Sequence, residues 1–207
     1  MPVVLVPAHR WERWLANFAE RHDATVVASV DGGLHGVSGD GSRFTAALPF
    51  DRTYEGDVAR FADAAAPPGD WGVLLVRKGG FAVALMHGGE MIGSKVGQRH
   101  VQGRTKAGGQ SQQRFARRRD NQARQAFEAA ADHAVRVLGD LRGPLVTGGD
   151  HDAVEETLSD PRLTTASAAR VARWLPVPDP RRGVLEQAIR DSCAISVDVH
   201  DTQRDIG

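Results

Sequence analysis

The sequence of 207 residues has one cysteine, Cys193, and no long apolar run. A single cysteine excludes an intramolecular disulfide and a thiolate zinc site, and it is typical of a protein in a reducing compartment. Nowhere do about 18 apolar residues follow one another, and the N-terminus has no basic region followed by an apolar stretch, so neither a membrane span nor export is predicted. We therefore expect a soluble, cytoplasmic protein without a membrane partner.

Net charge is also absent, because 26 basic and 26 acidic residues balance. The charges are nevertheless unevenly distributed. Between Lys95 and Arg124, nine Lys or Arg residues accompany a single acidic residue, Asp120, which gives this segment a local charge of +8. Such a concentration of basic residues is typical of a surface that binds phosphates, whatever the charge of the whole chain.

The first third of the chain predicts a small α+β unit. Trp11, Trp14, Leu15 and Phe18 recur at helical spacing and predict an amphipathic helix over residues 9–21 with two buried tryptophans. β-Branched residues predict strands over 25–30 and 43–48, and the glycines at positions 36, 39 and 41 favour turns. The alanine- and proline-rich stretch 62–70 is the predicted boundary. We expect residues 1–66 to form a separate N-terminal unit whose role the sequence does not indicate.

The remainder, residues 67–207, predicts a second domain of the α/β class with a mixed sheet and flanking helices. Three apolar runs separated by glycine pairs predict an antiparallel meander over 71–77, 81–87 and 90–96. Residues 97–109 are poor in apolar side chains and predict an exposed loop. Further elements are predicted in this order: a helix over 111–138, a strand over 144–147, helices ending at 158 and covering 167–174 and 180–193, and a strand over 194–200.

The most informative stretch joins the predicted loop to the following helix. It contains the tripeptide Gly108-Gly109-Gln110, then Ser111 and, three residues later, Arg-Phe-Ala-Arg over 114–117. Two successive glycines leave no side chain between the backbone and a ligand, so this tip can enter a narrow site. The start of the helix offers free N–H groups to anions, and the surrounding arginines can bind phosphates. The combination favours a tip that is inserted into RNA.

This motif resembles the peptidyl-hydrolysis domain of archaeal and eukaryotic class I release factors, and the resemblance covers roughly residues 71 to 200. The chain has no room for the stop-codon-reading and partner-binding domains of those factors. It is more similar to the short bacterial and actinobacterial branch of the VLRF type, the release-factor-like peptidyl-tRNA hydrolases of ribosome quality control. The resemblance implies a fold like the middle domain of class I release factors.

The resemblance also implies an activity and a site. The expected substrate is the ester of peptidyl-tRNA on a stalled large ribosomal subunit, the expected protein is a monomer, and no metal or cofactor is expected. Gly108, Gly109 and Gln110 would be catalytic, with the Gln110 N–H stabilising negative charge and its side chain placing a water molecule. The expected RNA-binding residues are the basic ones around them: Lys95, Arg99, Arg104, Lys106, Arg114, Arg117, Arg118 and Arg119.

Two other functions stay open at this stage. A metal-dependent nuclease that cuts tRNA near its 3′ end would need clustered carboxylates, and the meander with its following helix offers only Glu90, Asp120 and Glu128. A non-catalytic adaptor could use the loop to occupy an RNA site. Asp150, His151 and Asp152 resemble metal ligands, but acidic residues before an apolar helix more often cap its free N–H groups.

Overall fold

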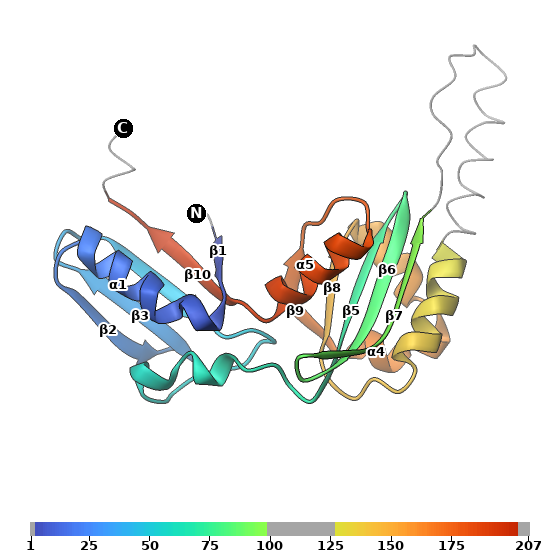
Figure 1. Ribbon diagram of the computed structural model, residues 1–207, viewed down its shortest axis with the longest axis horizontal. Helices are drawn as coiled ribbons and strands as arrows, with labels where there is room; N and C mark the ends of the chain where they lie inside the picture. The colour runs from blue at the N-terminus through green and yellow to red at the C-terminus, as the bar shows by residue number, and fades with distance from the viewer. Residues whose placement is uncertain (1–2, 99–126, 203–207) are drawn as a thin grey trace, which may run out of the picture. The chain divides into compact units, whose positions relative to one another are not determined.

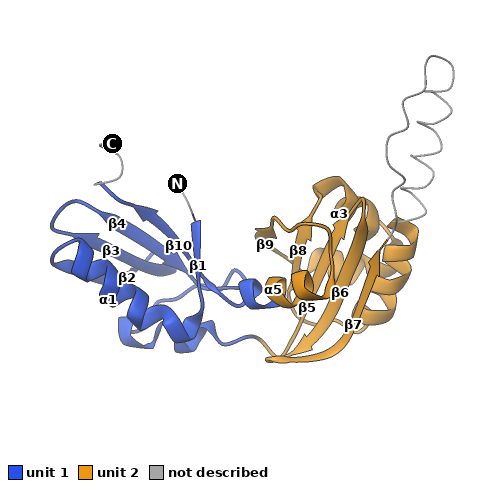
Figure 2. Cartoon of the chain, turned by 45° about the horizontal axis from the view of Figure 1, so that its top comes forward, with its two compact units in different colours: residues 1–67, 189–207 blue, residues 68–188 orange. Residues whose placement is uncertain are grey.

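The computed structural model describes residues 3–98 and 127–202. Two compact units make up the chain (Figure 2). Unit 1 comprises residues 1–67 and 189–207, and unit 2 comprises residues 68–188. Each unit has its own five-stranded sheet and its own hydrophobic core.

Unit 1 is an antiparallel sheet with the strand order β1-β10-β4-β3-β2, and α1 covers one face of it (Figure 1). Its described elements are β1 (Val3–Val6), η1 (Ala8–Arg10), α1 (Trp11–Arg21), β2 (Thr25–Val30), β3 (Gly33–Ser38), β4 (Arg43–Ala47), η2 (Val58–Arg60), η3 (Asp63–Ala65) and β10 (Ile195–His200).

Aromatic side chains form the core beneath α1. Trp11, Trp14 and Phe18 follow one another at helical spacing, and the two tryptophan rings stack with centroids 5.4 Å apart. All three rings lie nearly perpendicular to the ring of Phe44 on β4, with centroid distances of 5.0 to 6.1 Å. Gly36 makes room for Phe44, because a Cβ at this position would lie 2.0 Å from Cε1 of the ring. The predicted N-terminal helix is therefore confirmed, while Gly36 lies in a strand and not in a turn.

The C-terminal strand corrects the predicted domain boundaries. β10 pairs with β1 on one side and β4 on the other, so it lies within the sheet of unit 1 and not in a domain that extends over 67–207. Ile195 and Val197 are fully buried there. The alternation of apolar residues over 194–200 predicted the strand correctly, but alternation does not tell which sheet receives it.

Unit 2 contains a mixed sheet with the strand order β7-β6-β5-β8-β9. β5, β6 and β7 form the predicted antiparallel meander, while β8 and β9 run parallel to β5. The described elements are β5 (Asp70–Arg77), β6 (Gly80–His87), β7 (Glu90–Gln98), a helix over 127–138, β8 (Leu145–Gly149), α3 (His151–Leu158), η4 (Pro161–Leu163), α4 (Thr164–Ala168), β9 (Arg170–Leu175) and α5 (Arg182–Ser192), which crosses the unit boundary. The predicted α/β class with a mixed sheet is confirmed.

Helices cover both faces of this sheet (Figure 1). The 127–138 helix and α3 share one core cluster with Leu74 and Val76 of β5. Val73 and Leu75 alternate with these two residues along β5. They point to the opposite face, where α5 lies, and are equally inaccessible to solvent. A strand buried on both faces reads as a continuous apolar run, which is why β5 was evident from the sequence.

One predicted helix is wrong. Residues 167–174 were expected to be helical, but α4 ends at Ala168 and β9 follows as the edge strand of the sheet. The alanines and arginines of this segment favour a helix locally. Pairing with β8 prevails over that preference, because it satisfies the backbone groups of β8 on its open side.

Candidate functional site

Most of the predicted site lies outside the described residues. Gly108, Gly109 and Gln110 belong to the segment 99–126, as do Arg99, Arg104, Lys106, Arg114, Arg117, Arg118 and Arg119. Lys95 is the one predicted site residue in the part of the chain that the structure describes, and its side chain is exposed on β7. The structure therefore describes the two elements that flank the predicted site, the end of β7 and the start of the 127–138 helix, which together form its base.

That base lies at one edge of the unit 2 sheet. β7 runs in the same direction as β5, because both are antiparallel to β6, and β8 and β9 are parallel to β5. The carboxyl ends of β5, β7, β8 and β9 thus meet at the same edge. β7 reaches this edge at Gln98, directly before the segment with the glycine-glycine-glutamine motif. In open α/β sheets, this is the edge at which ligands are usually bound.

The carboxyl end of β7 is held in place by close packing against β6 and the 127–138 helix. Gly97 lies under the ring of Phe81 on β6, and a Cβ at position 97 would lie 2.3 Å from Cε1 of that ring. The other face of Phe81 is available to His133 of the 127–138 helix, whose ring stacks on Phe81 with centroids 5.2 Å apart. Ala130, Ala134 and Leu138 anchor the same helix in the core. Strand and helix are therefore fixed to each other on either side of the 99–126 segment.

The helix runs antiparallel to β7. A Cβ on Gly93 would lie 3.8 Å from Val137, whereas His133 stacks on Phe81, the partner of Gly97. Glu128 consequently lies toward the Gln98 end of β7, and Glu90 begins the strand at the opposite end. The strand is nine residues long, so these carboxylates are separated by roughly 20 Å or more. Glu90 and Glu128 therefore cannot share a metal ion, while Asp120, the third carboxylate of the nuclease hypothesis, lies outside the described residues.

Positively charged side chains lie near the end of β7, on the face of the sheet that the 127–138 helix covers. Burial lowers the pKa of His133, and the charges of Arg136 and Lys95 lower it further against the opposite effect of Asp132. On the other face of β7, the guanidinium of Arg182 donates to the Ser94 hydroxyl at 3.2 Å and to Glu186 at 2.7 Å. Lys95 is the one described residue of the predicted basic set. It lies near His133 and Arg136 of the 127–138 helix, which the sequence did not indicate.

The suggested metal ligands at 150–152 do not form a metal site. Among the described residues, no group of three or more His, Cys, Asp or Glu side chains is arranged to hold a metal ion. His151 instead stacks on Trp174 of β9, with ring centroids 3.6 Å apart. Asp150 occupies the position before α3, although its side chain makes no capping hydrogen bond there. The predicted helix start is confirmed and side-chain capping by Asp150 is not.

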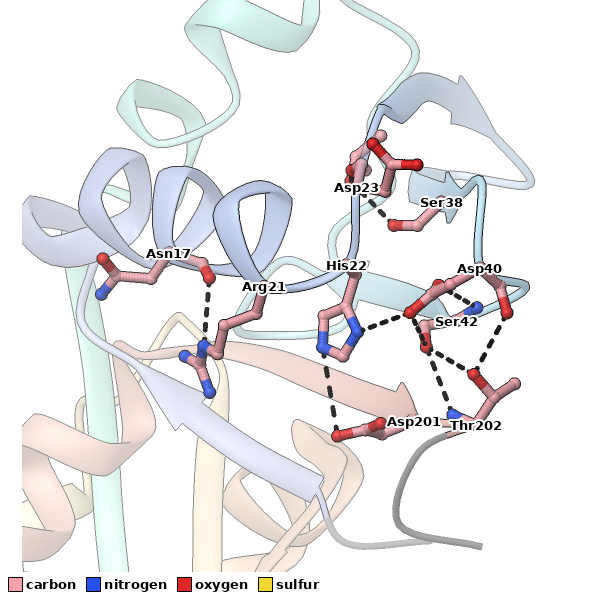
Figure 3. Close-up of polar contacts among 10 residues, drawn as sticks. Asn17, Arg21, His22, Asp23, Ser38, Asp40, Ser42, Asp201 and Thr202 are labelled. Atoms are coloured by element: carbon pink, nitrogen blue, oxygen red, sulfur yellow. Dashed lines mark hydrogen bonds and ion pairs between the residues drawn. The ribbon is translucent and has the colours of Figure 1, made fainter. Parts of the chain in front are cut away.

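Sequence reasoning missed a polar cluster in unit 1 (Figure 3). The buried His22 lies between two carboxylates, with Nδ1 3.1 Å from Asp40 and Nε2 4.0 Å from Asp201. The Ser42 hydroxyl is shared between Asp40 and Thr202, at 3.2 and 3.0 Å. Hydrogen bonds from the Ser42 N–H and from His22 keep the pKa of Asp40 below its ordinary value. The cluster joins the residues that follow β10 to the turn between β3 and β4 and to the end of α1, and no sequence pattern links residues about 160 positions apart.

A known protein family matches most of unit 2 and part of β10. The family model of the actinobacterial and chloroflexi VLRF1 release factors, acVLRF1, matches residues 69–198, which include the meander, the glycine-glycine-glutamine motif and the 127–138 helix. The chain belongs to this release factor family. Family membership places the chain among release-factor-like proteins. The resemblance predicted from the sequence is confirmed.

Three solved structures are similar to the chain at low identity. An archaeal protein has 16% identity and a TM-score of 0.38, covering 73% of this chain and 48% of its own. The archaeal translation termination factor aRF1 has 16% identity and a TM-score of 0.36, covering 68% and 39%. Pelota from Archaeoglobus fulgidus has 10% identity and a TM-score of 0.29, covering 91% and 60%. The chain thus spans less than half the length of the first two.

No curated protein matches the chain. None of the helices in the described part is both long and apolar enough to cross a membrane.

Proposed function

We propose that the chain is a cytoplasmic, monomeric peptidyl-tRNA hydrolase that releases nascent chains from stalled large ribosomal subunits. The observation that carries this proposal is the sequence Gly108-Gly109-Gln110-Ser111 followed by Arg-Phe-Ala-Arg, inside the part of the chain that matches the release factor family. Its position between a strand and a helix that are packed against each other supports the proposal, because a catalytic tip needs a rigid base.

The reaction is the hydrolysis of an ester. The oxygen of a water molecule attacks the carbonyl carbon, and the bond between this carbon and the ribose oxygen of the tRNA breaks. The ribose oxygen takes up a proton from the water, which leaves a peptide with a free carboxyl group and an intact tRNA. A glutamine side chain cannot take up that proton near neutral pH, so Gln110 acts by orientation and by hydrogen bonding. Its backbone N–H stabilises the negative charge on the oxyanion or the leaving oxygen.

The basic residues have a different task. Lys95, Arg99, Arg104, Lys106, Arg114, Arg117, Arg118 and Arg119 bind phosphates of ribosomal RNA and tRNA. Phosphate contacts position a protein on RNA without reading its sequence. This suits an enzyme whose substrates carry many different peptides and tRNAs.

The decisive experiment measures peptide release from stalled large-subunit complexes, with binding measured in parallel. Gln110→Ala should lower the release rate on the order of 100-fold, because the water is no longer placed, and should bind like the parent. Gly109→Ala should be more damaging if position 109 needs a close approach or a conformation that a Cβ forbids. Gln113→Ala changes a glutamine in the same segment and serves as the matched control, with release expected at the parent rate.

The products separate the alternatives. Labelled peptidyl-tRNA should yield intact tRNA and free peptide, whereas a nuclease would yield a shortened tRNA and an adaptor would yield neither. Release at the parent rate by both Gln110→Ala and Gly109→Ala would show that the proposed site is wrong.

A further inference from the structure

Three side chains with nitrogen donors gather on one face of the unit 2 sheet, near the end of β7. Lys95 is exposed on β7, opposite Val83 and two residues before Gly97. His133 and Arg136 come from the helix that packs on this face. Strand and helix are far apart in the sequence, so the fold alone brings these groups together.

The imidazole of His133 is oriented from two sides. One face stacks on Phe81, and Nδ1 lies 3.0 Å from Nη2 of Arg136. A guanidinium has no acceptor, so Arg136 donates and His133 Nδ1 accepts. The neutral ring therefore carries its proton on Nε2. Within the described residues, Nε2–H has no hydrogen-bond acceptor, and it remains a donor for a ligand.

The charges around the ring favour an anion. Lys95 and Arg136 are exposed cations, and neither has an ion pair with an acid among the described residues. Asp132, the acid whose charge acts on His133, is paired with Arg162 at 2.7 Å, and Arg162 also binds Asp160. Arg162 is shared by two carboxylates, so it offsets part of the charge of Asp132, and two cations outweigh this acid beside the ring. Two exposed cations then accompany one neutral, partly buried donor.

We propose that Lys95, His133 and Arg136 bind one backbone phosphate of RNA at the base of the 99–126 segment. The ligand class rests on the proposed function, because the same strand leads directly into the segment with the densest positive charge of the chain. Three donors from two elements match the several acceptor oxygens of a phosphate. The site extends the RNA-binding surface from the strand onto the helix.

The proposal carries a pH dependence. The groups that face His133 are Lys95 from β7, Arg136 and Asp132 from its own helix, and Arg162 beyond Asp132. A bound phosphate would add negative charge next to the ring and raise its pKa above the lowered value of the free protein. Since the complex then holds a proton more readily than the free protein, RNA binding should strengthen as the pH falls from 8 toward 6.

The experiment uses the full chain and a short RNA hairpin with a single-stranded 3′ end. Arg136→Gln and Lys95→Gln should each weaken binding several-fold and reduce the slope of log K against log salt by roughly one. Arg136→Lys should retain most of the affinity, because it keeps the charge. Arg142→Gln removes an exposed arginine beyond the opposite end of the helix and should bind like the parent. Urea unfolding midpoints check that each variant is folded.

A second measurement follows His133 itself. Its ring carbon-bound protons are followed by NMR as the pH is varied, with and without the hairpin. The pKa should rise on adding RNA, and His133→Gln should remove the pH dependence of binding. An unchanged His133 pKa, or unchanged affinity and salt slope in Arg136→Gln, would overturn the phosphate site.

These outcomes are independent of peptide release. If Gln110→Ala and Gly109→Ala both release peptide like the parent while Arg136→Gln loses RNA affinity, the proposed catalytic function is wrong and the phosphate site stands. If Gln110→Ala stops release while Arg136→Gln binds RNA like the parent, the reverse holds.

Discussion

At the scale of single residues, the base of the candidate site depends on glycine at position 97, which has no side chain. Gly97 allows the Phe81 ring to lie flat on the strand, and His133 then stacks on that ring. Any side chain at position 97 must displace Phe81. The requirement is steric and does not come from backbone conformation.

Gly97→Ala should therefore lower the free energy of unfolding by about 1–3 kcal/mol, the usual effect of overpacking a well-filled core. Urea unfolding followed by far-UV circular dichroism measures it. Gly93→Ala is the matched control on the same strand and face, because its Cβ would meet Val137 at an ordinary 3.8 Å. An equal loss in both variants would mean that glycine is needed for the strand itself and not for the Phe81 ring.

At the scale of elements, η4 is fixed by a single carboxylate. Asp160 accepts hydrogen bonds from the backbone N–H of Arg162 at 2.9 Å and from its guanidinium at 2.7 and 3.0 Å. The guanidinium is the main cause that lowers the pKa of Asp160 from 3.8 to about 2, and the backbone N–H comes next. The hydrogen bonds from its guanidinium to Asp160 and, next in size, to Asp132 raise the pKa of Arg162.

The sign of the resulting pH dependence follows from this shift. A carboxylate with a lowered pKa stabilises the folded state above its ordinary pKa of 3.8, and this contribution is lost as the pH falls through about 2. Asp160→Asn should unfold at lower urea than the parent at pH 5, and the difference should shrink between pH 4 and 2. Arg162→Gln should flatten the same profile, because it removes the main cause of the shift. A parent–variant difference that stays constant down to pH 2 would contradict this account.

The elements also show what the sequence could tell. The meander was predictable, because β5 and β6 are apolar on both faces and its three strands are separated by glycine pairs at 79–80 and 88–89. β9 was not, since its alanines and arginines favour a helix and only the open side of β8 makes it a strand. Local preference decides an element only where no tertiary partner competes.

Part of the candidate site could likewise be predicted from the sequence, and part could not. The glycine-glycine-glutamine motif and its arginines are contiguous, so their chemistry could be inferred from the chain itself. The group formed by Lys95, His133 and Arg136 could not, because His133 alone is an ordinary helical histidine with aromatic contact. Its significance arises from the ring of Phe81 and the strand beside it.

At the scale of the whole molecule, β10 is the strand on which unit 1 depends. It separates β1 from β4, so both of these strands lose a partner if β10 does not pair. Val197 is fully buried in the core formed by Trp11, Phe18 and Phe44. Unit 2 has no strand in this sheet.

Val197→Asp should consequently unfold unit 1 and leave unit 2 folded, because an unpaired buried carboxylate costs several kcal/mol. The four tryptophans report on this by NMR, with Trp11 and Trp14 in unit 1 and Trp71 and Trp174 in unit 2. Two indole N–H signals should move to unfolded positions, while that of Trp71, which donates to the Gly88 carbonyl, should not. Val37→Asp is the control, since its side chain is 56% exposed on the same sheet. Loss of all four signals would show that the units fold only together.

The position of β10 has a consequence for how the chain is made. Synthesis proceeds from the N-terminus, so residues 1–67 leave the ribosome first, yet their sheet is incomplete until residues 195–200 have followed. All strands of unit 2 are synthesised in between. Unit 2 can therefore close before the sheet of unit 1 is complete, although part of unit 1 is synthesised earlier. A nascent chain that stops short of β10 would carry the folded base of the candidate site together with an N-terminal segment whose apolar strands are still open, and it would be a target for the chaperones that bind such segments.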